Sequence, residues 1–235
     1  MPYFDVDWSQ RFDFGSPRSL SALKGVCVHT SEGNPSITAE NLANYQLTSQ
    51  TGSYHVIVDL TGKRLRENTD DWITWSSGNQ GNNTLLHICF TARADWTRQQ
   101  WLDQSKMLRA GATAVAHWCT TYGFPVRKVD TRSLPGILGH DDTRAWGGTD
   151  HTDPGPNFPY DVFAQMVKEV LNPASPAGAA MNIEQEIRNQ LTGSPDLGKY
   201  PGWPQLGGRT VVDALAAIGQ KLGISGFKDP KVGNR

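Results

Sequence analysis

Cysteine is scarce in this 235-residue chain. The three cysteines, Cys27, Cys89 and Cys119, are widely spaced and odd in number. This pattern argues against a disulfide framework and suits a reducing compartment. Because free cysteine is among the most often buried residues, we predict that each is a small apolar residue of the core.

Long apolar runs and an excess of positive charge are also missing. No stretch of about 18 apolar residues could span a membrane, and the acidic, aromatic N-terminus lacks the apolar core of a signal peptide. We therefore expect synthesis in a cytoplasm, with release by another factor if the substrate lies outside. A net charge of −1 disfavours nucleic-acid binding, which normally requires a basic surface.

The composition that remains is that of a loop-rich globular protein, with 24 Gly, 14 Pro and 37% hydrophobic residues. We predict one domain over residues 1–173 and a linker rich in Pro, Ala and Gly over 174–181. A helical C-terminal segment over 182–235 is expected to contain helices at 183–191 and 210–222.

Hydrophobic periodicity predicts a mixed α/β fold, in which helices flank one central sheet. The expected strands are 23–30, 54–59, 64–67, 85–92 and 125–130, and the expected helices are 38–50, 97–122 and 160–171. The apolar stripe of helix 38–50 is expected to include Tyr45, and that of helix 160–171 to include Val170. The first 20 residues are predicted to be irregular and held to the domain by Trp8, Phe12 and Phe14.

Residues 139–155 have neither helical nor strand periodicity, so we predict a loop. It contains His140, His151 and Asp153. Zinc binds neutral imidazole nitrogen and carboxylate oxygen, and a catalytic zinc keeps one position for water. His29, at the end of strand 23–30, is the best candidate for a ligand from elsewhere in the chain.

Each of these residues also has an ordinary structural explanation. His29 can be a polar residue that ends a strand, and His140 and His151 can be surface histidines. Asp153 can form a turn before Pro154. We interpret His55, His87 and His117 as structural residues.

Six short motifs occur in one order, and together they resemble the zinc-dependent N-acetylmuramoyl-L-alanine amidases of the peptidoglycan-recognition-protein superfamily, the type 2 amidases. The resemblance covers roughly residues 23–171. The motifs are Val28-His29-Thr30, Tyr54-His55, the segment 75–79, Asn82 or Asn83 before a strand, Gly139-His140 and the segment 152–156.

The resemblance implies a zinc site formed by His29, His140 and Asp153. It also implies that Tyr54 polarises water or substrate near the metal. A substrate groove is implied along the segment 75–79, and the substrate contacts we predict are Trp75, Asn79 and Thr30.

Two departures from the family pattern concern the acid–base residue. His151 stands where many relatives carry Lys or Thr, and strand 85–92 lacks a Glu that some relatives have. The catalytic role is therefore left open between His151 and Tyr54.

The implied function is zinc-dependent hydrolysis of the amide bond between N-acetylmuramic acid and L-alanine in bacterial peptidoglycan. We expect a bacteriophage endolysin, held in the host cytoplasm until the membrane is breached. The alternative is a peptidoglycan-binding module without catalysis, which would typically lack a zinc ligand. A zinc peptidase or deaminase is disfavoured because the HExxH and Cys-x-x-Cys patterns are missing. The oligomeric state, the host and the preferred stem peptide are left open.

Overall fold

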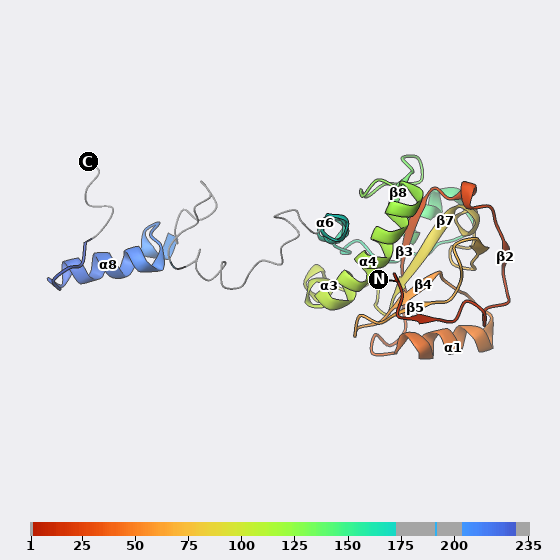
Figure 1. The fold of residues 1–235 in the computed structure, drawn as a ribbon, viewed down its shortest axis with the longest axis horizontal. Helices are drawn as coiled ribbons and strands as arrows, with labels where there is room; N and C mark the ends of the chain where they lie inside the picture. Colours follow the sequence, from red (N-terminus) through yellow and green to blue (C-terminus); the bar gives the residue numbers. More distant parts are fainter. Residues whose placement is uncertain (1, 173–190, 192–203, 229–235) are drawn as a thin grey trace. The chain divides into compact units, whose positions relative to one another are not determined.

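A six-stranded mixed sheet organises the first part of the chain (Figure 1). The computed structural model describes residues 2–172, 191 and 204–228. The chain divides into two compact units, Met1–Gly178 and Ala179–Arg235. The sheet of the first unit has the order β1 (Val6–Asp7), β5 (Arg64–Arg66), β4 (Val56–Val58), β7 (Leu85–Phe90), β3 (Gly25–Thr30) and β8 (Gly136–Gly139).

The pairing of β4 with β5 is antiparallel, and the other pairings in this sheet are parallel. A separate two-stranded ribbon joins β2 (Ser16–Pro17) to β6 (Trp72–Ile73). The helices are α1 (Ala39–Ser49), α2 (Gly81–Thr84), α3 (Arg98–Asp103), α4 (Ser105–Tyr122), α5 (His140–Thr143), α6 (Tyr160–Leu171) and α8 (Val211–Lys221), with 3-10 turns at Leu20–Ala22, Arg144–Trp146 and Pro204–Leu206. The predicted fold class, a central mixed sheet flanked by helices, is confirmed.

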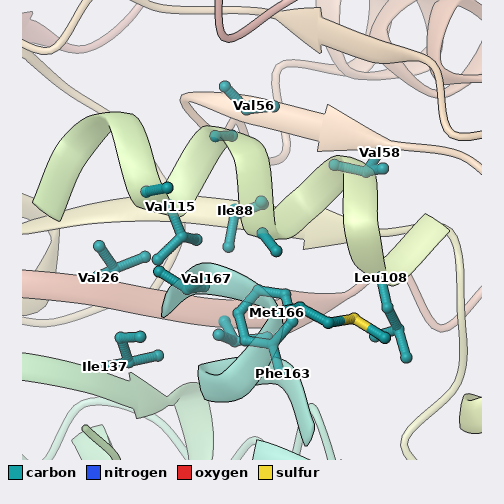
Figure 2. Close-up of a cluster of buried hydrophobic side chains, with 14 of the residues drawn as sticks. Val26, Val56, Val58, Ile88, Leu108, Val115, Ile137, Phe163, Met166 and Val167 are labelled. Atoms are coloured by element: carbon teal, nitrogen blue, oxygen red, sulfur yellow. The ribbon is translucent and has the colours of Figure 1, made fainter. Parts of the chain in front are cut away.

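Helices cover both faces of the sheet. On one face, α4 and α6 pack on the valine and isoleucine side chains of β3, β4, β7 and β8, as Figure 2 shows for Val26, Ile88 and Phe163. On the other face, α1 contributes Ala39 and Ala43 to a second cluster. Because β3 and β7 are buried on both faces, their sequences are almost continuously apolar, as is typical of central parallel strands.

The helix ends follow local signals in the sequence. The Thr38 side chain accepts a hydrogen bond from the Asn41 backbone N–H and so caps α1. Thr97 and Gln100 form a capping box at the start of α3. Gly123 ends α4 with φ +70°, a left-handed conformation that glycine adopts at little cost.

Four predicted elements differ from the structure. The long helix 97–122 is broken at Gln104, whose ψ of 40° leaves the helical region, although no Gly or Pro marks the break. Segment 125–130 contributes one isolated bridge, Lys128 to Ile137, because a turn at Asp130 ends the pairing. The predicted loop 139–155 begins with a helix, α5, because the Asp142 carboxylate accepts the Gly139 backbone N–H at 2.8 Å. The N-terminal arm is not irregular throughout, since β1 adds an edge strand to the sheet.

Two predicted core residues are also wrong. Tyr45 is exposed, and α1 instead packs through Ala39, Ala43 and Gln46, whose positions bring the helix close to the sheet. Val170 is exposed at the end of α6. The other predicted positions of α6, Phe163, Met166 and Val167, are buried.

The second unit is described from residue 204 to 228 and at 191. It contains α8, within the predicted helix 210–222, and the Thr210 side chain caps it by accepting the Asp213 backbone N–H. The predicted helix 183–191 and the linker lie almost wholly outside the described residues, so the predicted domain limits stay predictions. Among the described residues, no helix has both the length and the hydropathy needed to cross a bilayer.

Candidate metal centre

The sheet register brings two predicted ligands side by side. Strands β3 and β8 are parallel neighbours, and Val28 pairs with Gly139. The residues that follow are His29 and His140, at the carboxyl ends of the two strands. Crevices at the carboxyl ends of parallel strands are the usual ligand sites of α/β sheets.

Asp153 completes the group from the other end of the α5 segment. Its carboxylate lies 3.2 Å from Nδ1 of His29 and 3.0 Å from Nδ1 of His140. One ligand atom from each residue lies within 4.8 Å of the others, and all three residues are buried. Ligands 2.0–2.2 Å from a tetrahedral zinc are roughly 3.3–3.6 Å apart, so the spacing suits this ion.

Hydrogen bonds determine which ring nitrogen of His29 carries the hydrogen and which carries the lone pair. The Gly81 carbonyl lies 3.1 Å from Nε2 of His87 and can only accept, so this nitrogen carries the hydrogen. Nδ1 of neutral His87 must then accept from Nε2 of His29, at 2.9 Å. The lone pair of His29 is therefore on Nδ1, and it points at Asp153.

The same accounting applies to His140. Its Nε2 lies 3.3 Å from the carbonyl oxygen of Ser77, an acceptor, and 3.2 Å from the Thr149 hydroxyl. Nε2 therefore carries the hydrogen, and Nδ1 presents a lone pair. Two imidazole lone pairs and a carboxylate thus face one another, an arrangement that a cation between them would stabilise.

The protonation of the site suits metal binding. Burial lowers the pKa of His29, which keeps the imidazole neutral near pH 7. Burial alone would raise the pKa of Asp153, but positive charge on the facing imidazoles, with Nδ1–H donated to the carboxylate, outweighs this effect and lowers it; a cation in that place would act in the same direction. Neutral imidazoles and an ionised carboxylate are the forms that bind zinc.

A second group, Cys27, His29 and His87, has comparable spacing. It fits a metal less well, because the nitrogens of His29 and His87 already share a hydrogen bond. Cys27 and His87 are fully buried, and burial raises the pKa of the Cys27 thiol well above its usual range. The group of His29, His140 and Asp153 borders two cavities, one with His140 and the other with Asp153 in its wall.

A groove opens over His29, His140 and Asp153. One cavity has a volume of about 510 Å³, and its wall contains Tyr54, Trp75, Ser77, His140 and His151. A smaller one, of about 200 Å³, contains Glu32, His151 and Asp153. A larger cavity, of about 570 Å³, is lined by Lys24 and Trp146 and by none of the three ligand residues.

Tyr54 and His151 flank the centre on two sides. The Tyr54 ring lies 5.1 Å from the His29 ring, and burial raises the pKa of its hydroxyl, which stays protonated. The His151 ring stacks on His140 at 4.6 Å, and its Nδ1 is 3.4 Å from the Asp153 carboxylate. The His151 side chain is 61% exposed, so it faces any bound substrate.

The three predicted substrate contacts differ in placement. Trp75 is 46% exposed at the rim of the groove, with its ring 5.1 Å from Phe14. Asn79 is instead engaged within the fold, since its Nδ2 donates to the carbonyls of Thr143 and Gly147. Thr30 donates its backbone N–H to the Asp153 carboxylate, while its hydroxyl donates to Glu32. Asn79 and Thr30 thus hold the site in place.

His87 is the functional residue that the sequence interpretation missed. The sequence interpretation took it only as a structural residue on a strand, whereas strand pairing decides which residues it contacts. In the sheet, His87 is opposite Cys27, two residues from His29. A second histidine on a neighbouring buried strand was the available signal.

Comparisons with known proteins agree with this geometry. Residues 19–156, more than half of the chain, match the family described as N-acetylmuramoyl-L-alanine amidase, and residues 176–226 match the Rv3766 C-terminal domain. No curated protein sequence matches the chain.

Solved structures share the fold. The Staphylococcus aureus hydrolase AmiA superposes with a TM-score of 0.57 at 17% identity, over 70% of this chain and 84% of that chain. The Ph2119 endolysin from the Thermus scotoductus MAT2119 bacteriophage Ph2119 superposes with a TM-score of 0.51 at 13% identity, over 69% and 97%.

Proposed function

Because the chain belongs to the N-acetylmuramoyl-L-alanine amidase family, we propose that it hydrolyses the amide bond between N-acetylmuramic acid and L-alanine in peptidoglycan, with a zinc ion held by His29, His140 and Asp153. The observation that carries the zinc site is the convergence of three acceptor atoms, two imidazole Nδ1 and one carboxylate, on one point at the base of a groove. Family membership carries the choice of substrate.

Zinc bound there would polarise the scissile carbonyl and lower the pKa of bound water to about 7. The protein's own contribution begins with orientation. His87 holds the His29 ring, and Ser77 holds the His140 ring, so both Nδ1 atoms keep their direction. The Thr30 backbone N–H fixes one oxygen of Asp153. Such supporting contacts usually strengthen metal binding 10- to 100-fold.

We propose that Tyr54 and His151 act on the substrate. The protonated Tyr54 hydroxyl can donate a hydrogen bond to the carbonyl oxygen as negative charge develops there. A donor of this kind typically contributes about 3 kcal/mol of barrier lowering. His151, exposed in the groove and stacked on His140, can deliver a proton to the departing amine of L-alanine.

Trp75 gives the groove an apolar rim on which a sugar ring or a peptide side chain can pack. The biological role we propose is that of a phage lysis enzyme, which reaches the wall once the membrane is breached. The fold shared with the Ph2119 endolysin is in keeping with that role.

A binding module without catalysis is the competing function. It needs the groove but not a complete set of metal ligands. All three ligand residues are present, buried and in contact here, and two further groups, Tyr54 and His151, flank them. This completeness favours the enzyme.

Mass spectrometry of digested cell wall tests the proposal. The purified chain should release stem peptides with free L-alanine N-termini from isolated peptidoglycan. Removal of zinc with a chelator should stop the release, and added zinc should restore it. New reducing sugar ends, new termini within the stem peptide, or adsorption to the wall without products would each contradict the amidase assignment. Release that persists without metal would contradict the zinc dependence but not the amidase assignment.

A further inference from the structure

A cavity of about 430 Å³ lies outside the metal centre, between the N-terminal arm and the segment that leads into β6. The arm contributes Ser9, Gln10 and Phe12, and the segment contributes Asn68, Asp71 and Trp72. The volume is within the range of small-ligand sites. The arm residues precede the part of the chain that matches the amidase family, residues 19–156, whereas the residues from the segment before β6 lie within it.

Polar groups around this cavity have unused hydrogen-bonding capacity. Among the described residues, no hydrogen bond engages the side chains of Gln10, Thr69 or Asp71, all of which are in the cavity wall. Asn68 is 1% exposed and donates to the Tyr54 carbonyl, but its carboxamide oxygen has no partner. That oxygen is inaccessible, so the groups available to a ligand in the cavity are the side chains of Gln10, Thr69 and Asp71.

The remaining wall is apolar, from Phe12, Pro17 and Trp72, and Asp71 is the one ionisable side chain in it. Neutral amides and hydroxyls beside aromatic rings suit a ligand that is uncharged, rich in hydroxyl groups and apolar on its ring faces. Sugars have this chemistry: their hydroxyls would hydrogen-bond with Gln10, Thr69 and Asp71, and their C–H faces would pack on the aromatic side chains.

We propose that this cavity is a saccharide subsite, which binds an N-acetylated sugar of the glycan strand away from the bond that is cut. This inference rests on the proposed function, because that function makes a glycan polymer the substrate.

The subsite and the groove share one segment of chain. Trp72 is in the wall of the subsite, and Trp75, three residues later, is at the rim of the groove. Their Cα atoms are at most about 11 Å apart by chain length. Asn68 and Tyr54 provide a second link through their hydrogen bond, with one residue in each wall. One glycan strand can therefore contact both, whereas a substrate with a single sugar contacts the groove alone.

The test compares two substrates and two variants of the full chain. Gln10→Ala/Asp71→Ala removes two exposed side chains that no internal hydrogen bond engages, so the fold should be kept. The control, Asp13→Ala, removes an exposed carboxylate of the same arm that is not in the cavity wall. The substrates are intact peptidoglycan and a soluble N-acetylmuramoyl peptide with one sugar.

The double variant should have a KM for intact peptidoglycan about tenfold higher than wild type, as expected when two hydrogen bonds are lost. Its kcat/KM on the one-sugar substrate should be unchanged, and Asp13→Ala should match wild type on both. An equal loss on both substrates, or no loss on intact peptidoglycan, would overturn the subsite.

NMR titration separates this inference from the proposed function. With tetra-N-acetylchitotetraose as the probe, backbone shifts are expected for residues 9–12 and 68–72 in the wild type and not in the double variant. Shifts confined to residues 75–79, or none at all, would overturn the subsite even if the chain is an amidase. Shifts at 9–12 and 68–72 in a chain that cleaves neither substrate would support the sugar site and contradict the proposed function.

Discussion

Four histidines are buried in this protein: His29 lies in the carboxyl-terminal half of β3, His140 directly follows β8, His87 lies within β7, and His55 directly precedes β4. His29 and His140 are 1% and 3% exposed, and His55 and His87 are both 0% exposed. Burial therefore does not separate the proposed ligands from the structural histidines. The difference is in the partners of the ring nitrogens.

His55 and His87 use both ring nitrogens inside the fold. His87 bonds His29 and the Gly81 carbonyl, while Nδ1 of His55 accepts the His87 backbone N–H and its Nε2 contacts Arg18. In His29 and His140, only Nε2 has a partner elsewhere in the fold. The Nδ1 atom of each ring faces the Asp153 carboxylate. A ligand is recognised by the nitrogen that the fold leaves without a donor.

The largest expected effect comes from removing a strand-end histidine. The His140→Ala variant should neither bind zinc nor hydrolyse the cell wall, because one of the three metal ligands is removed. His117→Ala is the matched control, since His117 is an exposed histidine that stacks on Tyr3. Metal content by mass spectrometry and release of L-alanine termini are the measurements. A His140→Ala protein that still binds one zinc per chain would show that a free Nδ1 does not identify a zinc ligand.

His151→Ala should reduce kcat about 10²- to 10³-fold, the range found for a lost donor or general acid. Its zinc content should be unchanged, because the side chain is exposed and touches Asp153 only at 3.4 Å. Tyr54→Phe, which keeps the ring and removes the hydroxyl, provides the parallel measurement. Full turnover by His151→Ala would show that this histidine is a bystander.

A variant of His87 tests whether a sheet histidine supports the metal from behind. His87→Leu removes the acceptor for Nε2–H of His29, so zinc affinity should decrease about 10- to 100-fold. His87→Gln retains a side-chain acceptor and should lose less. Competition with a chelator of known affinity measures both, with circular dichroism to check folding. Wild-type affinity in a folded His87→Leu protein would mean that the contact is incidental.

The smallest effect concerns pH and the metal-free protein. Burial lowers the pKa of His29, His55 and His87, so below about pH 6.5 the unfolded chain takes up protons that the folded chain does not. The free energy of unfolding should therefore decrease as the pH falls below that value. Burial raises the pKa of Glu67 well above its usual range, so its effect on stability is opposite to that of the histidines. The free energy of unfolding decreases as the pH rises from about 4.3 to the pKa of Glu67 in the folded protein.

Three histidines outweigh one carboxyl, so the free energy of unfolding should decrease on acidification below about pH 6.5. Glu67→Gln keeps the shape and removes a titration of opposite sign, so it should make this decrease steeper. Denaturant unfolding with a chelator present, at several pH values, measures the slope for both proteins. A variant whose slope equals that of wild type would show that Glu67 does not contribute to it.

Local patterns in the sequence predicted much of the fold. The apolar run 85–90 identified a central strand, and Thr38 and Gly123 marked helix ends that the structure has at the same residues. These features depend on neighbours in the chain, such as a cap three residues from its donor. The break at Gln104 lacked such a signal, whereas for the helix at 140–143 Asp142, three residues after Gly139, was a local signal that was missed.

The sequence by itself determined which residue types were available: two histidines and an aspartate next to strand ends, in a chain without disulfide or membrane patterns. Only the tertiary structure decided how they are used. Which nitrogen of His29 carries the lone pair depends on His87 and Gly81, more than 50 residues away, and its direction depends on Asp153, 124 residues away. Hydrogen-bond partners of that kind are set by strand pairing and packing, which no local pattern encodes.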